Sequence, residues 1–155
     1  MNSIKTAKLI SLVIMASEVI YGVIVYLLHK NNPAFEISAA KNFNPTIFKG
    51  LYFAAAAIVL FILILKRTLF YSRALIKLDE EQILAKFATF FIVLNAISEA
   101  IGIMGLIMYF ATGSFKHAIT LIGVSFIATI LVYPFDYAVS GYLGEIEKKK
   151  RYSSY

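Results

Sequence analysis

The sequence predicts an all-α integral membrane protein with four transmembrane helices. Of its 155 residues, 60% are hydrophobic and only 15% are charged, and the mean hydropathy is +0.78. This composition lies outside the range of soluble globular domains. The chain also contains four apolar runs, each close to the roughly 20 residues that an α-helix needs to cross the hydrocarbon core. Together these observations favour one membrane domain that spans residues 1–155.

The four runs lie in order along the chain, and backbone groups in lipid must be hydrogen-bonded within each segment. The first run begins after a charged start but contains Glu18 and is long for a signal peptide, so we expect it to be retained. The second run is followed by helix-compatible residues and is expected to extend past Leu65. Asp79 and Glu80 precede the third run, where their charge suits the positive end of a helix dipole. The runs are Leu9–Leu28, Ile47–Leu65, Phe87–Phe110 and Ala118–Phe135.

The distribution of basic residues predicts the orientation. If four helices cross the membrane, 11 Lys and Arg residues fall on the side of the two termini and four fall on the other side. Basic residues are enriched in cytoplasmic segments, so both termini are predicted to be cytoplasmic, in a plasma or inner membrane. This pattern accounts for the net charge of +6 without a nucleic-acid partner. The four residues on the opposite side are Lys30, Lys41, Lys49 and Lys116.

Two stretches of the chain resemble each other, which predicts an internal duplication. Ser17-Glu18 in the first run and Ser98-Glu99 in the third lie at matching depth, and a Phe-Lys pair opens each following run. The first hairpin repeat would cover residues 1–78 and the second residues 79–144, with a basic tail at 145–155. Runs one and three cross in the same direction, so the repeats would be of the parallel type.

Glu18 and Glu99 are the candidate functional residues because each interrupts an apolar run near its middle. An unpaired ionised carboxylate there costs several kcal/mol, and the runs contain no central Lys or Arg to pair with it. We therefore expect protonated, hydrogen-bonded carboxyls that can bind H+ or Na+ when water reaches them. Helical spacing places Gly22 on the face of Glu18 and places Asn95, Ser98 and Gly102 on that of Glu99, and Ser17, Ser98 and Asn95 are candidate hydrogen-bond partners.

The segment SEAIGIMGLIM at residues 98–108 resembles the carboxylate helix of the proteolipid (c-type) rotor subunits of rotary ATPases. Their motif resembles Glu-Ala-aliphatic-Ala-Ile-Tyr-Gly; Glu99, Ala100, Ile103 and Gly105 match it, and Met104 stands where the tyrosine would be. SEVIYGVIVYLL at residues 17–28 is similar, but its Tyr-Gly pair lies two residues closer to the glutamate. The resemblance implies ion translocation by the glutamates, with Gly105 as a supporting residue. The helix order departs from that family, where the carboxylate lies on the second helix of each hairpin.

Two functions are therefore predicted from different classes. The first is an ion-handling protein, in a homo-oligomer or a larger complex, that binds H+ or Na+ at Glu18 and Glu99. The second is a structural or accessory subunit of a membrane complex, in which both carboxyls are protonated and hydrogen-bond between helices. A small membrane enzyme ranks third, because no catalytic signature is recognised. His29 and His117 have no further ligands at a recognisable spacing and the chain has no cysteine, so no metal site or cofactor is predicted.

Overall fold

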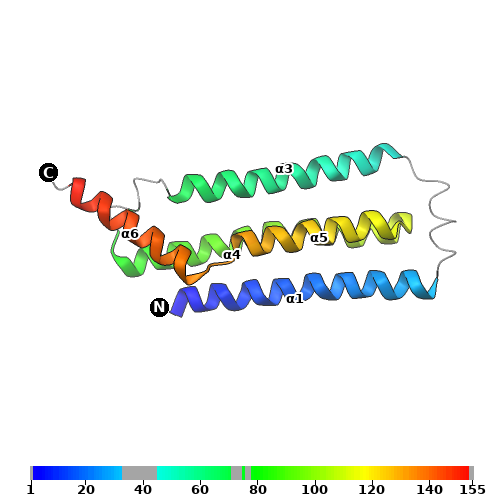
Figure 1. Ribbon diagram of the computed structural model, residues 1–155, viewed down its shortest axis with the longest axis horizontal. Helices are drawn as coiled ribbons and strands as arrows, with labels where there is room; N and C mark the ends of the chain where they lie inside the picture. Colours follow the sequence, from blue (N-terminus) through cyan, green and yellow to red (C-terminus); the bar gives the residue numbers. More distant parts are fainter. Residues whose placement is uncertain (1, 33–44, 71–74, 76–77, 154–155) are drawn as a thin grey trace.

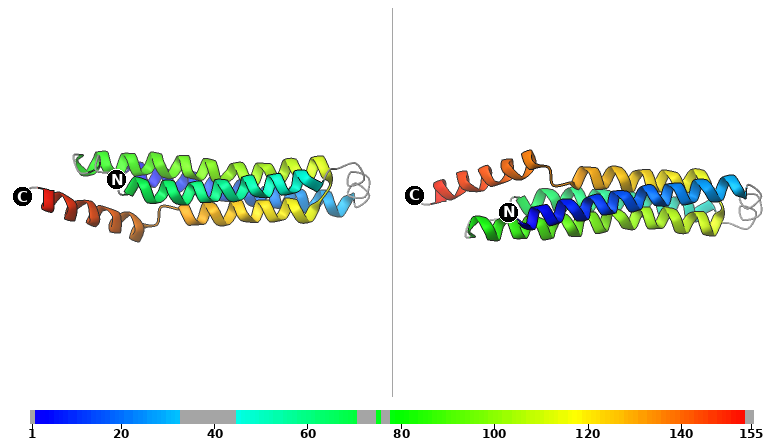
Figure 2. Two further views of the ribbon diagram at one scale, coloured as in Figure 1. Left: turned by 90° about the horizontal axis from the view of Figure 1, so that it is seen from above. Right: turned by 90° about the horizontal axis from the view of Figure 1, so that it is seen from below.

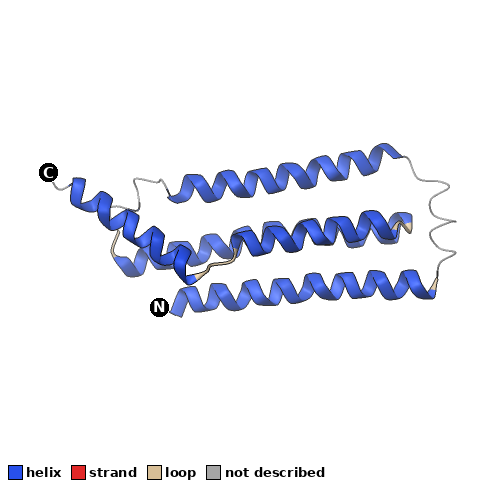
Figure 3. Ribbon diagram, in the orientation of Figure 1, coloured by secondary structure: helices blue, strands red, loops and turns tan. Residues whose placement is uncertain are grey.

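The computed structural model describes residues 2–32, 45–70, 75 and 78–153. Its elements are α1 (Asn2–Asn31), α3 (Pro45–Phe70), α4 (Glu80–Thr112), α5 (Phe115–Val132) and α6 (Asp136–Ser153) (Figure 1). No strand occurs in these residues (Figure 3). Four of the helices are long and apolar enough to cross a membrane, and they favour an integral membrane protein, as the sequence predicted.

The four apolar helices form a bundle in which α4 and α5 lie side by side at the centre. The α1 and α3 helices lie on opposite sides of that pair (Figures 1 and 2). The N-terminus and α6 lie at the same end of the bundle, which we call the terminal end (Figure 1). Glu18 and Glu99 therefore belong to two helices that pack against each other.

The exterior of the bundle is apolar, as a lipid-facing surface requires. Leu9 is 63% exposed, Phe53 79% and Ile107 61%, and each lies in an apolar helix. Exposed apolar area on this scale marks a membrane or protein contact surface. A few polar side chains of these helices are nevertheless buried in the interior of the bundle.

The start of α4 shows why a helix forms here. Asp79 is the N-cap and accepts a hydrogen bond from the Gln82 backbone N–H at 2.7 Å, while the Gln82 side chain accepts from the Asp79 N–H. This reciprocal capping box satisfies two backbone donors, and Glu80 and Glu81 add negative charge at the positive end of the dipole. The predicted placement of Asp79 and Glu80 at this helix start is confirmed.

The end of α5 differs from the sequence prediction, which extended the fourth run to Phe135. The helix ends at Val132, and Tyr133 adopts an extended conformation with φ −59° and ψ 133°. Pro134 disfavours a helical conformation in the residue before it, which explains the early end. The freed carbonyl of Leu131 accepts a hydrogen bond from Lys66 Nζ at 2.6 Å, so the terminal end of α3 is tied to that of α5.

A fifth helix, α6, follows this break and was not anticipated from the sequence. Val139 and Ile146 are 7% and 4% exposed and join a core cluster with Ile83 and Phe87 of α4. Lys150 Nζ donates to the Leu78 carbonyl at 2.6 Å, and Lys8 Nζ pairs with Asp136 at 2.5 Å. The helix is therefore docked at the terminal end of the bundle (Figure 1).

Three of the basic residues that predict the orientation lie outside the described residues. These are Lys41 in the loop between the first two runs, and Arg73 and Lys77 in the segment between the second and third. The division into two repeats and the cytoplasmic side of the termini stay predictions.

Candidate functional site

The candidate site lies where α1, α4 and α5 meet inside the bundle. Apart from Thr112 at the end of α4, the buried polar side chains of the described residues all lie there, six in number and each no more than 1% exposed. We call them the polar cluster. They are Ser11, Glu18, Asn95, Ser98, Ser125 and Thr129.

Glu18 extends from α1 toward α5, where two hydroxyls hold its carboxyl. Thr129 donates to Glu18 Oε1 at 2.9 Å, and Ser125 also donates to Oε1. Ser125 and Thr129 are four residues apart and therefore share one face of α5. The two hydrogen bonds join the middle of α1 to α5.

The Ser125 hydroxyl has a second contact, with the Ser98 backbone carbonyl of α4 at 2.7 Å. A hydroxyl has only one proton to donate and two lone pairs to accept. When Glu18 is ionised, Ser125 can donate to the carboxylate; when Glu18 is protonated on Oε1, the carboxyl can donate to Ser125 and Ser125 to the Ser98 carbonyl. Rotation of the Ser125 hydroxyl thus allows it to hydrogen-bond Glu18 in both the ionised and the protonated state.

Glu99 lies in a different environment. Its Oε1 accepts from the Ser17 hydroxyl at 2.8 Å and from the Tyr21 hydroxyl at 3.0 Å, both on α1. Glu99 is only half-buried, whereas Glu18 is 1% exposed. The two carboxyls therefore link different pairs of helices: Glu18 joins α1 to α5, and Glu99 joins α4 to α1.

No cationic side chain contacts either glutamate in the part of the chain that the structure describes. Glu18 Oε2 is buried and has no hydrogen-bond partner among these residues. An unsatisfied buried oxygen is costly, and more so if it carries charge. The surroundings thus favour a neutral acid unless a donor or cation reaches Oε2.

The predicted supporting residues occupy three kinds of position. Ser17 is confirmed as a partner of a glutamate, and Ser98 contributes its backbone carbonyl, while its hydroxyl donates to the Leu94 carbonyl at 3.0 Å. The prediction that Asn95 partners a carboxyl is wrong. Its amide instead donates to Ser11 at 2.9 Å and to the Phe91 carbonyl at 2.7 Å, and thereby ties α4 to α1 nearer the terminal end.

The glycines allow two of the helices to approach closely. A Cβ on Gly105 would lie 2.8 Å from the Ala118 carbonyl oxygen, and one on Gly102 would lie 3.1 Å from Ser125 Oγ. These two positions keep α4 against α5 at the level of the carboxyls. A Cβ built on Gly22 would have no atom within 4 Å, so Gly22 is not needed for a close approach between helices.

Sequence reasoning missed Ser125, Thr129 and Tyr21. The sequence did contain a signal for Ser125 and Thr129, because hydroxyls four residues apart lie on one face of the fourth apolar run. A Ser or Thr in a helix commonly bonds its own i−4 carbonyl, however, as Thr112 does here at 2.8 Å. Spacing alone therefore did not reveal that Ser125 and Thr129 face a carboxyl on another helix.

No protein-family model, curated protein or solved structure matches this chain. The described residues also contain no group of three or more His, Asp or Glu side chains that could hold a metal ion. The resemblance to rotary ATPase proteolipids stays an expectation based on the residues quoted above.

Proposed function

We propose that this chain is a membrane protein that binds and releases a proton at Glu18, as part of proton movement across or within the bilayer. The observation that carries the proposal is the arrangement of Glu18, Ser125 and the Ser98 carbonyl, which can hydrogen-bond both charge states of one buried acid. A carboxyl with a purely structural role needs only one of these states.

Glu99 is proposed as a second, more accessible carboxyl of the same function. It is half-buried and contacts the residue that directly precedes Glu18, because Ser17 donates to it at 2.8 Å. Successive residues of a helix point in directions about 100° apart, so Ser17 and Glu18 reach different neighbouring helices from one turn of α1. A proton held at Glu99 would thus lie close to Glu18 without sharing its partners.

H+ is favoured over Na+ as the bound ion. The oxygens gathered near Glu18 Oε1 are those of Ser125, Thr129 and the Ser98 carbonyl, and the last already accepts from Ser125. A hard metal ion needs several oxygens whose lone pairs face it. If Na+ prevents carbodiimide labelling of Glu18, Na+ is the bound ion instead of H+. The test therefore includes Na+.

The test is labelling by a hydrophobic carbodiimide, which reacts with protonated carboxyls in apolar surroundings. Read by mass spectrometry at Glu18 itself, labelling should fall as the pH rises, be absent in Glu18→Gln and be little changed by Na+. Glu145→Gln, which alters an exposed carboxyl on α6, is the matched control. In proteoliposomes, Glu18→Gln should abolish proton flux. If Glu18 is unlabelled at every pH and the wild-type protein carries no flux, the proposal is wrong.

The second candidate function is that of a structural or accessory subunit. The observation that favours it is that both carboxyls join neighbouring helices, Glu99 through Ser17 and Tyr21 and Glu18 through α5. This function predicts that Glu99→Gln keeps activity while Gly102→Leu, which would collide with Ser125, disrupts assembly in the membrane. A protein that purifies alone as a stable monomer argues against it.

The proposed topology places both termini in the cytoplasm, with the chain built from two hairpin repeats in a plasma or inner membrane. The excess of basic residues at the terminal end supports this orientation. Because the chain has no cysteine, single cysteines introduced at Ser3 and Gly50 would report each side with a membrane-impermeant thiol reagent. Reaction of the Ser3 site from the outside of intact cells would reverse the orientation.

A further inference from the structure

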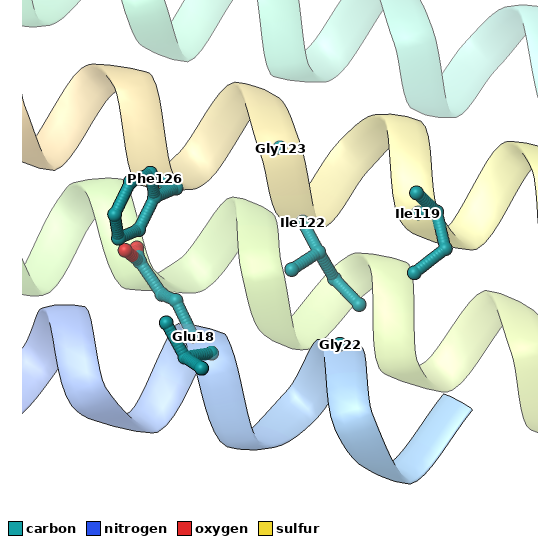
Figure 4. Close-up of a pocket in the computed structure, with 7 residues that line it drawn as sticks. Glu18, Gly22, Ile119, Ile122, Gly123 and Phe126 are labelled. Atoms are coloured by element: carbon teal, nitrogen blue, oxygen red, sulfur yellow. The ribbon is translucent and has the colours of Figure 1, made fainter. Parts of the chain in front are cut away.

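A hollow of about 230 Å³ lies between α1 and α5 and is open on the outer face of the bundle. In Figure 4 the Glu18 side chain extends from α1 toward α5, from which Phe126 and Ile122 also project. Apart from Glu18, its lining is apolar. The lining residues are Glu18, Val19, Gly22, Ile119, Ile122, Gly123 and Phe126.

The hollow faces the region that lipid would occupy. Val19 on its rim is 55% exposed, and Gly123 is also exposed, although both lie in helices that are apolar enough to span the membrane. No atom lies within 4 Å of a Cβ built on Gly22 or on Gly123, so the two glycines leave open space. A ligand that dissolves in the bilayer could therefore enter from the side.

The unpartnered oxygen of Glu18 indicates which chemistry such a ligand would carry. Oε2 is buried with no hydrogen-bond partner in the described residues, while Oε1 accepts both hydroxyl donors of α5. A cationic N–H donor would satisfy Oε2 and neutralise the carboxylate together. A neutral apolar molecule would do neither.

We propose that this hollow binds a small lipophilic organic cation, with its ammonium group at Glu18 Oε2 and its apolar body against Ile119, Ile122 and Phe126. The proposal rests on the proposed function, because Glu18 must release its proton to pair with the cation. Binding is therefore competitive with protonation, and a bound cation displaces one proton. Glu18 is 1% exposed, so a side-chain rotation of Glu18 or Phe126 must accompany entry.

Size and aromatic character support this ligand class. A cavity of about 150 Å³ is known to admit benzene, so about 230 Å³ has room for one ring with a short amine. Phe126 can also attract a cation placed over its ring face. Drug-sized ligands need about 300 Å³ or more, and larger cations are expected to bind poorly.

Benzylammonium is the test ligand, with ethylbenzene as its uncharged analogue of similar shape. In detergent micelles under weak buffering, benzylammonium should bind with release of about one proton per chain, and ethylbenzene should release none. Glu18→Gln should weaken benzylammonium binding roughly thirtyfold or more, as expected when one member of a desolvated charge pair is removed. Glu145→Gln, which alters an exposed carboxyl on α6 outside the site, should leave binding within about twofold.

A second pair of variants tests the hollow without altering the acid. Gly123→Leu should fill the open space and abolish benzylammonium binding, while carbodiimide labelling of Glu18 persists. Gly50→Leu on α3 is the matched control, because its Cβ position is equally open but far along the chain from the hollow. Loss of binding in both glycine variants, or in neither, overturns the proposal.

The outcomes separate this inference from the proposed function. Labelling of Glu18 that depends on pH, without proton release on benzylammonium addition, overturns the cation site and leaves proton binding intact. Equal binding of ethylbenzene and benzylammonium also overturns it, since the carboxylate then plays no part. Absence of both pH-dependent labelling and cation binding removes both proposals.

Discussion

Gly105→Ala is expected to destabilise the bundle, because α4 and α5 approach closely at this residue. The added Cβ would lie 2.8 Å from the Ala118 carbonyl oxygen, 3.0 Å from Ile122 Cγ1 and 3.1 Å from Leu121 Cβ. Two of these neighbours are a backbone atom and a Cβ, which cannot move aside by changing rotamer. The helices must therefore separate.

The magnitude follows from this displacement. Non-bonded carbon atoms prefer separations of about 3.5–4.0 Å, so the helices must part by roughly half an ångström, and a gap of that size already forfeits about a quarter of each dispersion contact. Over-packing of this kind typically costs about 1–3 kcal/mol. Alanine recovers at most about 1 kcal/mol through its higher helix propensity. The free energy of unfolding should fall by up to about 2 kcal/mol.

The assay is equilibrium unfolding in mixed detergent micelles, followed by helical circular dichroism. Two matched glycine-to-alanine substitutions, for which smaller effects are expected, serve as controls. Gly102→Ala meets Ser125 Oγ at 3.1 Å and Ser125 Cβ at 3.4 Å, which are longer contacts than those at Gly105, and should cost less than Gly105→Ala; Gly123→Ala meets nothing within 4 Å and should be neutral or stabilising. If Gly105→Ala unfolds at the same denaturant fraction as Gly123→Ala, the close α4–α5 contact does not contribute as argued.

Three further predictions concern hydrogen bonds between helices. Ser125→Ala removes the hydroxyl between Glu18 and α4 and should lower the unfolding free energy by about 0.6–1.7 kcal/mol, the range of membrane hydrogen bonds; an unchanged value contradicts its linking role. Tyr21→Phe should cost about 0.6 kcal/mol and should cost nothing more in a Glu99→Gln background, which a double-mutant cycle measures. Lys66→Met leaves the Leu131 carbonyl without its Nζ donor and should speed amide hydrogen exchange at the end of α5, and protection equal to wild type counts against this contact.

The parts of the fold that sequence could predict are those with a local physical cause. The four apolar runs had to be helical in lipid, and Asp79 with Gln82 three residues later is a complete capping box in the sequence itself. The α6 helix was missed because its charged residues suggested a solvated tail. Its core positions Val139 and Ile146 lie seven residues apart, which is a helical spacing, but two glycines lie between them and a run of basic residues follows.

The candidate site was predicted less completely, because its contacts are between residues far apart in sequence. Glu18 and Glu99 have similar local sequences, yet one is fully buried against α5 and the other half-buried against α1. This difference arises from the positions of whole helices around the bundle. The similar local sequences therefore identified both glutamates as candidate site residues but did not predict their different contacts.

The placement of α1 and α3 on opposite sides of the α4–α5 pair has a consequence for biogenesis (Figure 1). The α1 and α3 helices are synthesised first and share no core. They therefore lie in the lipid as separate helices until the second half of the chain is synthesised. The hydroxyls that bond Glu18 belong to α5, the last helix to be inserted, so this acid enters the bilayer before its partners exist. During that interval the neutral acid costs far less to hold in the bilayer than the carboxylate, so we expect Glu18 to be protonated in the nascent chain before the bundle closes around it.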